Sequence, residues 1–266
     1  MVIGNSGVSS SLIGQVQERQ NSVFERLSSG SRINSAADGA AAQQIIDRLT
    51  AQNEGTRQSI SNAFDGISLA QVAEGGLGGI NEDVNRIREL SIQAGNGILS
   101  DADRQAIQSE ITQLQDNISQ TIEQTNFAGQ ELLTSDGNIS FQVGANAGQQ
   151  IDVETNDIAS QLSGLLNVDV TTAGGAEAAL EEADAAIEAI GSARGELGAV
   201  QSRFESAARN LSEADINTAA ARSRIADTDF AQATSEQAAN NVLGQASISV
   251  QALSNQQQGQ VLSLLS

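Results

Sequence analysis

Carboxylates are the only side chains in this sequence that could serve as ordinary general bases, because the chain has no His, Lys, Cys or Tyr. Two pairs of acids stand two residues apart, Asp101 with Asp103 and Asp227 with Asp229. No second kind of catalytic group accompanies either pair. We therefore expect the first pair to mark a helix start and the second to be solvated or paired with Arg, and we expect no catalytic residue.

Metal and cofactor sites are equally poorly supported. Without His and Cys the chain cannot form the usual zinc, haem or thiolate sites. The run Asp136-Gly137-Asn138 lacks the remaining ligands of a calcium-binding loop. The glycines of Gly75–Gly79 do not follow a strand, as those of a phosphate-binding loop would. We expect no metal and no cofactor.

The charge is large and unevenly distributed. The 266 residues carry 33 acids and 13 bases, all Arg, for a net charge of −20, which argues against nucleic acid or an anionic membrane as a partner. Residues 105–193 hold 14 acids and no Arg, whereas Ala231–Ser266 holds only Glu236. An acidic middle suits solvent, and neutral amphipathic ends suit burial in an assembly. We expect no membrane-spanning segment and no cleaved signal peptide, since the opening residues lack a basic region followed by an apolar one.

Helices make up most of the secondary structure that the sequence predicts. No Pro interrupts the chain, and six Phe are its only aromatic residues, a composition typical of helical bundles and coiled coils. One helical face carries Leu12, Val16, Val23 and Leu27, and a Ser- and Gly-rich break follows at residues 28–31. A second helix is predicted over residues 45–94. Its stripe keeps heptad phase through Gly75–Gly79, so we predict one continuous helix there. Each Gly costs about 1 kcal/mol relative to Ala, so a break at these glycines is the alternative.

A turn and a hairpin follow. Gly95-Asn96-Gly97 is a turn signal, and Ser100 with Asp103 predicts a capping box at the start of the next helix, which would return antiparallel to its predecessor. Alternating apolar residues predict a β-hairpin over residues 138–154. Residues 165–175 read as a loose connection.

The helical pattern returns from Leu180 to Leu211, and a final helix is predicted from about Ile216 to the end. The final helix carries an apolar stripe of Val242, Ala246, Val250 and Leu253 and closes on Leu264 and Leu265. We predict a mainly α fold: a long antiparallel helical bundle or coiled coil with a small β-hairpin region, whose N- and C-terminal helices pair. The stripe of the last helix is expected to face that of the first, as a coiled coil formed only in an assembly.

Several segments resemble bacterial flagellin. Residues 25–34 read ERLSSGSRIN, residues 84–93 read VNRIRELSIQ, and residues 221–231 read ARSRIADTDFA; the chain ends in VLSLLS. The resemblance extends in order over nearly the whole chain, without the long variable insertion that many flagellins carry near residues 160–175. The chain therefore resembles a short flagellin that lacks the variable outer domains.

The resemblance implies a structural subunit that polymerises with itself into the flagellar filament for swimming motility. Residues 1–42 and 220–266 would form the inner helical core, and residues 43–175 and 176–219 the rod domain with its hairpin. The subunit would be secreted by the flagellar type III export machinery with an export chaperone, and would meet cap and junction proteins. Arg86, Leu90 and Glu110 resemble family positions that the vertebrate innate receptor for flagellin recognises; contacts between subunits are the alternative role for these residues.

Two other functions stay open on the sequence. A hook–filament junction protein shares the terminal helices, but the RIADTDFA and VLSLLS segments favour the filament protein. A helical surface adhesin would not need neutral amphipathic helices at both ends. Formation of long filaments by the purified chain would distinguish the filament protein from a junction protein, which should stop at short rings or not polymerise.

Overall fold

The computed structural model describes the backbone of residues 5–265 and the side chains of residues 11–257, 259 and 260. The chain forms two compact units, one from residues 1–53 and 216–266 and the other from residues 54–215. Both units are built mainly from helices, as predicted, with small antiparallel strand pairs in the second.

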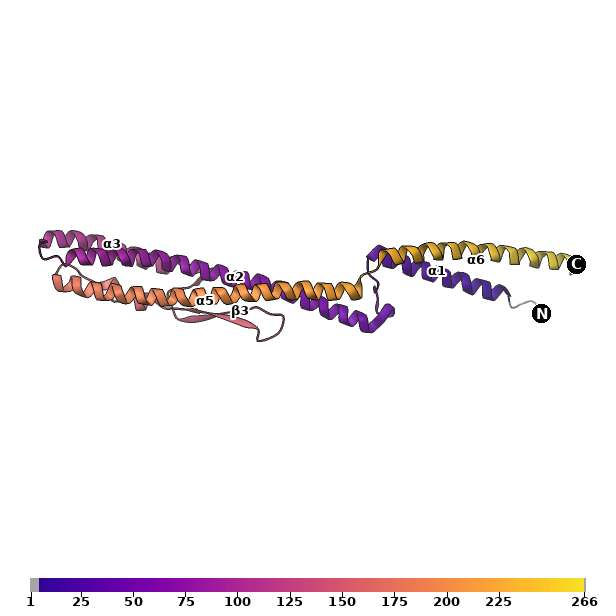
Figure 1. Ribbon diagram of the computed structural model, residues 1–266, viewed down its shortest axis with the longest axis horizontal. Helices are drawn as coiled ribbons and strands as arrows, with labels where there is room; N and C mark the ends of the chain where they lie inside the picture. The colour runs from indigo at the N-terminus through magenta and orange to yellow at the C-terminus, as the bar shows by residue number, and fades with distance from the viewer. Residues whose placement is uncertain (1–4, 266) are drawn as a thin grey trace. The chain divides into compact units, whose positions relative to one another are not determined.

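The first unit pairs the two terminal helices, α1 (Asn5–Ser29) and α6 (Phe230–Leu265), as predicted (Figure 1). Helix α1 ends where the sequence predicted, and Gly30 follows with φ of 71°, a left-handed conformation that favours glycine. The segment after α1 then pairs with the segment before α6: Arg32 N donates to Ala226 O at 2.6 Å, and Thr228 N donates to Gly30 O at 3.0 Å.

The prediction of one final helix from about Ile216 is wrong. Helix α5 (Ala173–Ala226) continues past that position, and the chain breaks before α6 begins at Phe230. The carboxylate of Asp229 accepts hydrogen bonds from the backbone nitrogens of Ala231 and Gln232, so it caps the new helix. The acid pair Asp227 and Asp229 thus lies at a helix junction.

Helix α2 (Ala36–Ala94) confirms the predicted continuity through Gly75–Gly79, since its one non-helical residue is Gly39, which is extended with φ of 161°. The carboxylate of Asp38 accepts from the backbone nitrogens of Asn34 and Ser35 and so caps the helix start. These bonds, and the one from the Ser35 hydroxyl, lower the pKa of Asp38. Leu77, which lies between the two glycine pairs, and Ile80, which follows them, are fully buried.

The second unit packs α2 against α3 (Asp101–Gln124) and α5, each antiparallel to it. Ion pairs mark the register: Arg86 reaches Glu110 on α3, while Arg88 reaches Asp184 and Arg57 reaches Asp215 on α5. All three involve exposed guanidinium groups and contribute little stability. The apolar stripes of these helices supply the core, which stabilises the unit.

The predicted β-hairpin is confirmed as β3 (Gly137–Gln142) paired with β4 (Gln150–Thr155). Its Phe141 ring meets the buried Phe204 ring of α5 edge-on, with centroids 5.5 Å apart. A smaller pair, β1 (Asn126–Phe127) and β2 (Gln130–Glu131), precedes it.

The connection to α5 is ordered, so the predicted loose segment is wrong. It contains α4 (Ile158–Gln161) and the short helix η1 (Leu165–Asn167). Leu165 and Val170 are buried, Gln115 Nε2 donates to Leu165 O at 2.9 Å, and Val170 N donates to Gln108 Oε1 at 2.7 Å. Two glutamines of α3 thus hold the segment in place.

Candidate assembly surface and neighbouring sites

The contact between α1 and α6 uses small and polar residues of α6. Gln20 Nε2 donates to Asn240 O at 3.2 Å and to Asn241 Oδ1 at 3.1 Å. A methyl group added at Gly244 would lie 3.2 Å from Gln20 Nε2 and 3.6 Å from Val16 Cγ1, so the absent side chain lets α1 approach closely. Val23 is buried in this unit, and Val16 and Leu27 are partly buried.

The apolar stripe of α6 does not face α1 in the single chain, whereas the predicted contact between the two stripes concerns the assembly and stays a prediction. The exposed fractions of Val242, Val250 and Leu253 are 66%, 61% and 56%, and Ala246 is exposed too. The opposite side of α6, with the buried Ala233 and the partly buried Gly244 and Ser247, meets α1 instead. Helix α6 therefore presents its apolar stripe outward. The positions Leu264 and Leu265 lie outside the described side chains.

Sequence reasoning missed part of this exposed surface. Leu243 and Ile248 of α6 are at least half exposed, as are Phe24 and the predicted Leu12 of α1. The sequence does show these residues, because α6 has large apolar residues on more than one side. A prediction based on a single apolar stripe leaves out those that lie beside the stripe. A group of exposed large apolar side chains on a pair of helices marks an interaction surface.

The three predicted receptor residues meet on neighbouring helices of the second unit. Arg86 Nη2 and Nε donate to Glu110 Oε1 at 2.6 and 3.0 Å, and Arg86 Nη1 donates to Glu89 Oε2 at 3.2 Å. The bond to Glu110, followed by that to Glu89, raises the pKa of Arg86. Leu90 is only 2% exposed and packs in the core. Arg86 and Glu110 thus lie on the surface, whereas Leu90 lies behind it.

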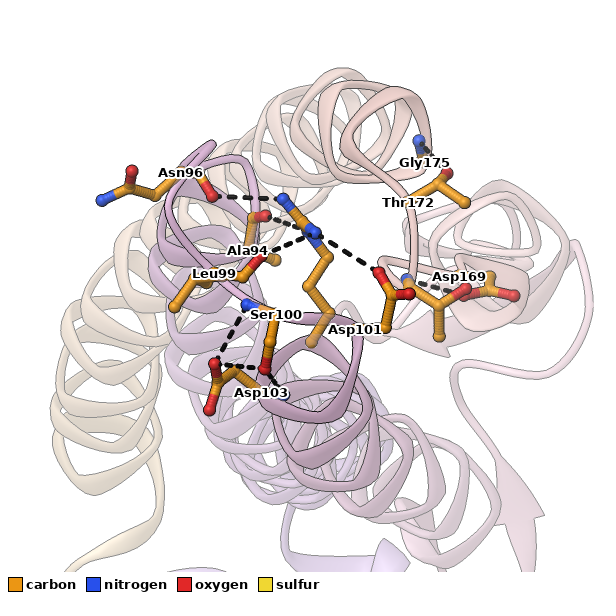
Figure 2. A network of polar contacts seen from close by, with 11 residues as sticks. Ala94, Asn96, Leu99, Ser100, Asp101, Asp103, Asp169, Thr172 and Gly175 are labelled. Carbon is orange, nitrogen blue, oxygen red and sulfur yellow. Dashed lines mark hydrogen bonds and ion pairs between the residues drawn. The ribbon is translucent and has the colours of Figure 1, made fainter.

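The first acid pair begins α3, as predicted. Ser100 and Asp103 form the predicted capping box: Asp103 N donates to the Ser100 hydroxyl, and Asp103 Oδ2 accepts from Ser100 Oγ at 2.6 Å and Ser100 N at 3.0 Å (Figure 2). The Ser100 hydroxyl, aided by its backbone nitrogen, lowers the pKa of Asp103. A carboxylate held ionised at a helix start is suited to capping.

Arg104 is a buried cation that sequence reasoning did not single out. Its Nε donates to Ala94 O at 3.0 Å, Nη1 to Leu99 O at 3.1 Å, and Nη2 to Asn96 O at 3.1 Å (Figure 2). It therefore ties the end of α2 to the turn and to the start of α3. In the part of the chain that the structure describes, no three His, Cys, Asp or Glu residues gather as a metal site would require.

Comparison with known proteins identifies the family. Residues 5–138 match the bacterial flagellin N-terminal helical region, and residues 180–265 match the bacterial flagellin C-terminal helical region. The chain is 39% identical to the flagellin of Bacillus subtilis (strain 168) over 277 residues, with 91% of each chain covered. It is 35% identical to the flagellar filament 30.7 kDa core protein of Treponema maltophilum over 271 residues, covering 96% of this chain and 95% of that one.

A solved structure agrees. The crystal structure of Bacillus cereus flagellin matches with a TM-score of 0.53 and 28% identity, over 57% of this chain and 88% of that one. Two family regions, which together span most of the sequence, and relatives matched over nearly their whole length point to one assignment. The chain belongs to the bacterial flagellin family and is a structural subunit of the flagellar filament.

Proposed function

We propose that this flagellin polymerises through the exposed apolar side of α6, helped by the exposed apolar residues of α1. The main support is that Val242, Val250 and Leu253 are more than half exposed, although α1 already covers the other side of their helix. Burying a Val or Leu side chain contributes roughly 1.5–3 kcal/mol relative to leaving it exposed. Repeated at every subunit, such contacts can drive assembly.

The charge distribution supports this choice of surface. Glu236 is the one charged residue in Ala231–Ser266, so neighbouring copies of α6 would add little repulsion. None of the 14 acids in residues 105–193 is buried, and thirteen of them are exposed. An assembly built on the terminal helices can leave these acids in solvent, where water and salt screen them.

The remaining expectations follow from membership of the family. We propose that the subunit leaves the cell through the flagellar export machinery with an export chaperone, meets cap and junction proteins, ends in the extracellular filament, and has no catalytic activity. Within the described residues, no helix is both long and apolar enough to cross a membrane. The proposed inner core is residues 1–42 with 220–266, and the proposed rod domain is residues 43–219.

The test is assembly of purified full-length variants. Val250→Glu and Leu253→Glu place a charge on the proposed surface, and Gln245→Glu adds the same charge to an exposed position beside it. We expect the first two to lose sedimentable filaments while Gln245→Glu still assembles, with all three keeping wild-type helix content. Equal assembly by all three variants would contradict the proposed surface. Wild-type chain that stops at short rings, or does not polymerise, would favour a junction protein.

We also propose that Arg86 and Glu110 form the receptor-recognised surface, with Leu90 supporting it from the core. The favouring observation is that the ion pair joins α2 and α3 at the surface, with both side chains 48% exposed. Arg86→Ala should weaken activation in reporter cells that carry the vertebrate receptor. Arg88→Ala, which removes the ion pair with Asp184, is the matched control. The same response from both variants would count against this surface.

A further inference from the structure

The turn between α2 and α3 holds one Asn-Gly pair, Asn96-Gly97, with its main chain fixed and its side chain outside. The Asn96 carbonyl accepts from Arg104 Nη2 at 3.1 Å and from Leu99 N at 3.2 Å. Figure 2 shows the Asn96 backbone oxygen turned toward the guanidinium group and its amide turned away. Asn96, Gly97 and Ile98 are all exposed.

These contacts activate two neighbouring groups that can react with each other, the Gly97 nitrogen and the side-chain carbonyl carbon of Asn96. The Asn96 carbonyl and the Gly97 nitrogen belong to the same peptide group, so a cation and a second donor on the oxygen draw electron density from the nitrogen and make its proton more acidic. The Asn96 amide oxygen accepts from Ile98 N at 3.3 Å, which polarises its carbonyl carbon. Over the described part of the chain, no hydrogen bond engages the Gly97 N–H.

The space around the pair is open. A methyl group added at Gly97 would meet no atom within 4 Å, and the Ile98 side chain is 88% exposed. Glycine also leaves its own nitrogen without the shielding that a side chain would give. Water can therefore reach the nitrogen, the amide carbon and any intermediate formed between them.

We propose that Asn96-Gly97 is a site of spontaneous deamidation that converts Asn96 to isoaspartate and aspartate. The Gly97 nitrogen loses its proton to hydroxide and attacks the Asn96 side-chain carbon. A nitrogen–carbon bond forms, the bond to the amide nitrogen breaks, and that nitrogen takes a proton and leaves as ammonia. Water then opens the five-membered imide at one of its two carbonyl carbons. Opening at the main-chain carbon gives isoaspartate, and opening at the former side-chain carbon gives aspartate. Each product adds one negative charge to the turn.

The test is peptide mass spectrometry of purified, full-length folded protein aged at mildly alkaline pH, together with labelling by an isoaspartate-specific methyltransferase. We expect the mass increase of amide-to-acid conversion to accumulate at Asn96. Asn117 and Asn138, each followed by Ile, are controls within the same digest and should stay amides. Gly97→Ala should slow the conversion at least about tenfold, because the methyl group shields the nitrogen. That variant should fold normally, since the site has room for the methyl group and no left-handed φ.

A synthetic peptide of residues 92–100 separates the effect of the fold from that of the sequence alone. We expect the folded chain to react at least as fast as the peptide. The proposal is overturned if Asn96 stays an amide in the folded chain while the peptide converts, if the control asparagines convert as quickly, or if Gly97→Ala reacts at the wild-type rate.

Discussion

Gly→Ala should raise the free energy of unfolding at Gly79 and lower it at Gly66, although both glycines lie in α2. Gly79 is exposed, and an added methyl group would meet no atom within 4 Å. At Gly66 the methyl group would overlap the ring of Phe204, whose Cε1 and Cε2 atoms would lie only 2.7 Å away. Phe204 is fully buried and rests edge-on against Phe141, so it cannot easily move aside.

The magnitudes follow from two effects. Gly→Ala in a helix interior stabilises by about 1 kcal/mol at either position. Overpacking a well-filled core costs typically about 1–3 kcal/mol, and only Gly66→Ala bears that cost. Because the helix-propensity gain is shared, the difference in free energy of unfolding between the two variants isolates the packing cost of about 1–3 kcal/mol. Gly79→Ala should raise the unfolding temperature by about 2–4 °C.

The assay is thermal and urea unfolding followed by far-ultraviolet circular dichroism, since the chain has no Trp or Tyr to report by fluorescence. Because the chain forms two compact units, the transition of the unit with residues 54–215 is the one to compare. The reasoning would be refuted if Gly66→Ala were as stable as Gly79→Ala, or if Gly79→Ala lowered stability.

Three further outcomes are expected. Arg104→Met removes the guanidinium donor from three carbonyls, of which Asn96 O keeps its bond from Leu99 N, and should cost about 2–4 kcal/mol in urea unfolding. An unchanged midpoint would show that the turn does not need Arg104. Because the pKa of Asp103 is lowered, its contribution to stability is present above the ordinary value of 3.8 and is lost as pH falls through the folded-state value. Asp103→Asn should therefore weaken the pH dependence of the melting temperature in that range. An unchanged pH dependence would contradict the stabilising role of the Asp103 carboxylate. The sedimentable filament fraction should rise as NaCl increases from about 0.01 M to about 1 M, because salt screens the exposed acids; a flat or falling fraction would show that charge repulsion does not limit assembly.

Periodicity and capping chemistry were enough to predict most helices. The stripe through Leu77 and Ile80 gave the correct helix in spite of its glycines, because burial of those side chains outweighs local propensity. Ser100 and Asp103 gave the correct start of α3, since their hydrogen bonds are local in sequence. The hairpin was predictable for the same reason, from alternation over a few residues.

The features that the sequence did not predict are determined by contacts between residues far apart in the sequence or with the backbone. The break before α6 has no Pro or Gly to announce it, and it depends on pairing of the Asp227 segment with Ser31, almost two hundred residues earlier. The face of α6 that meets α1 in the single chain could not be predicted, because apolar periodicity identifies a stripe but not its partner. Gly244 and Gln20 set that contact through close approach and hydrogen bonding. Arg104 was missed since its partners are backbone carbonyls, which leave no sequence signal.

Helical reconstruction of the assembled filament by electron cryomicroscopy is the decisive test of the proposed assembly surface, because it locates the α6 side chains within the polymer. We predict that Val242, Val250 and Leu253, exposed in the single chain, are buried between neighbouring subunits, and that the acids of residues 105–193 stay in solvent. A filament in which those three apolar side chains remain exposed to water would contradict the proposed assembly surface.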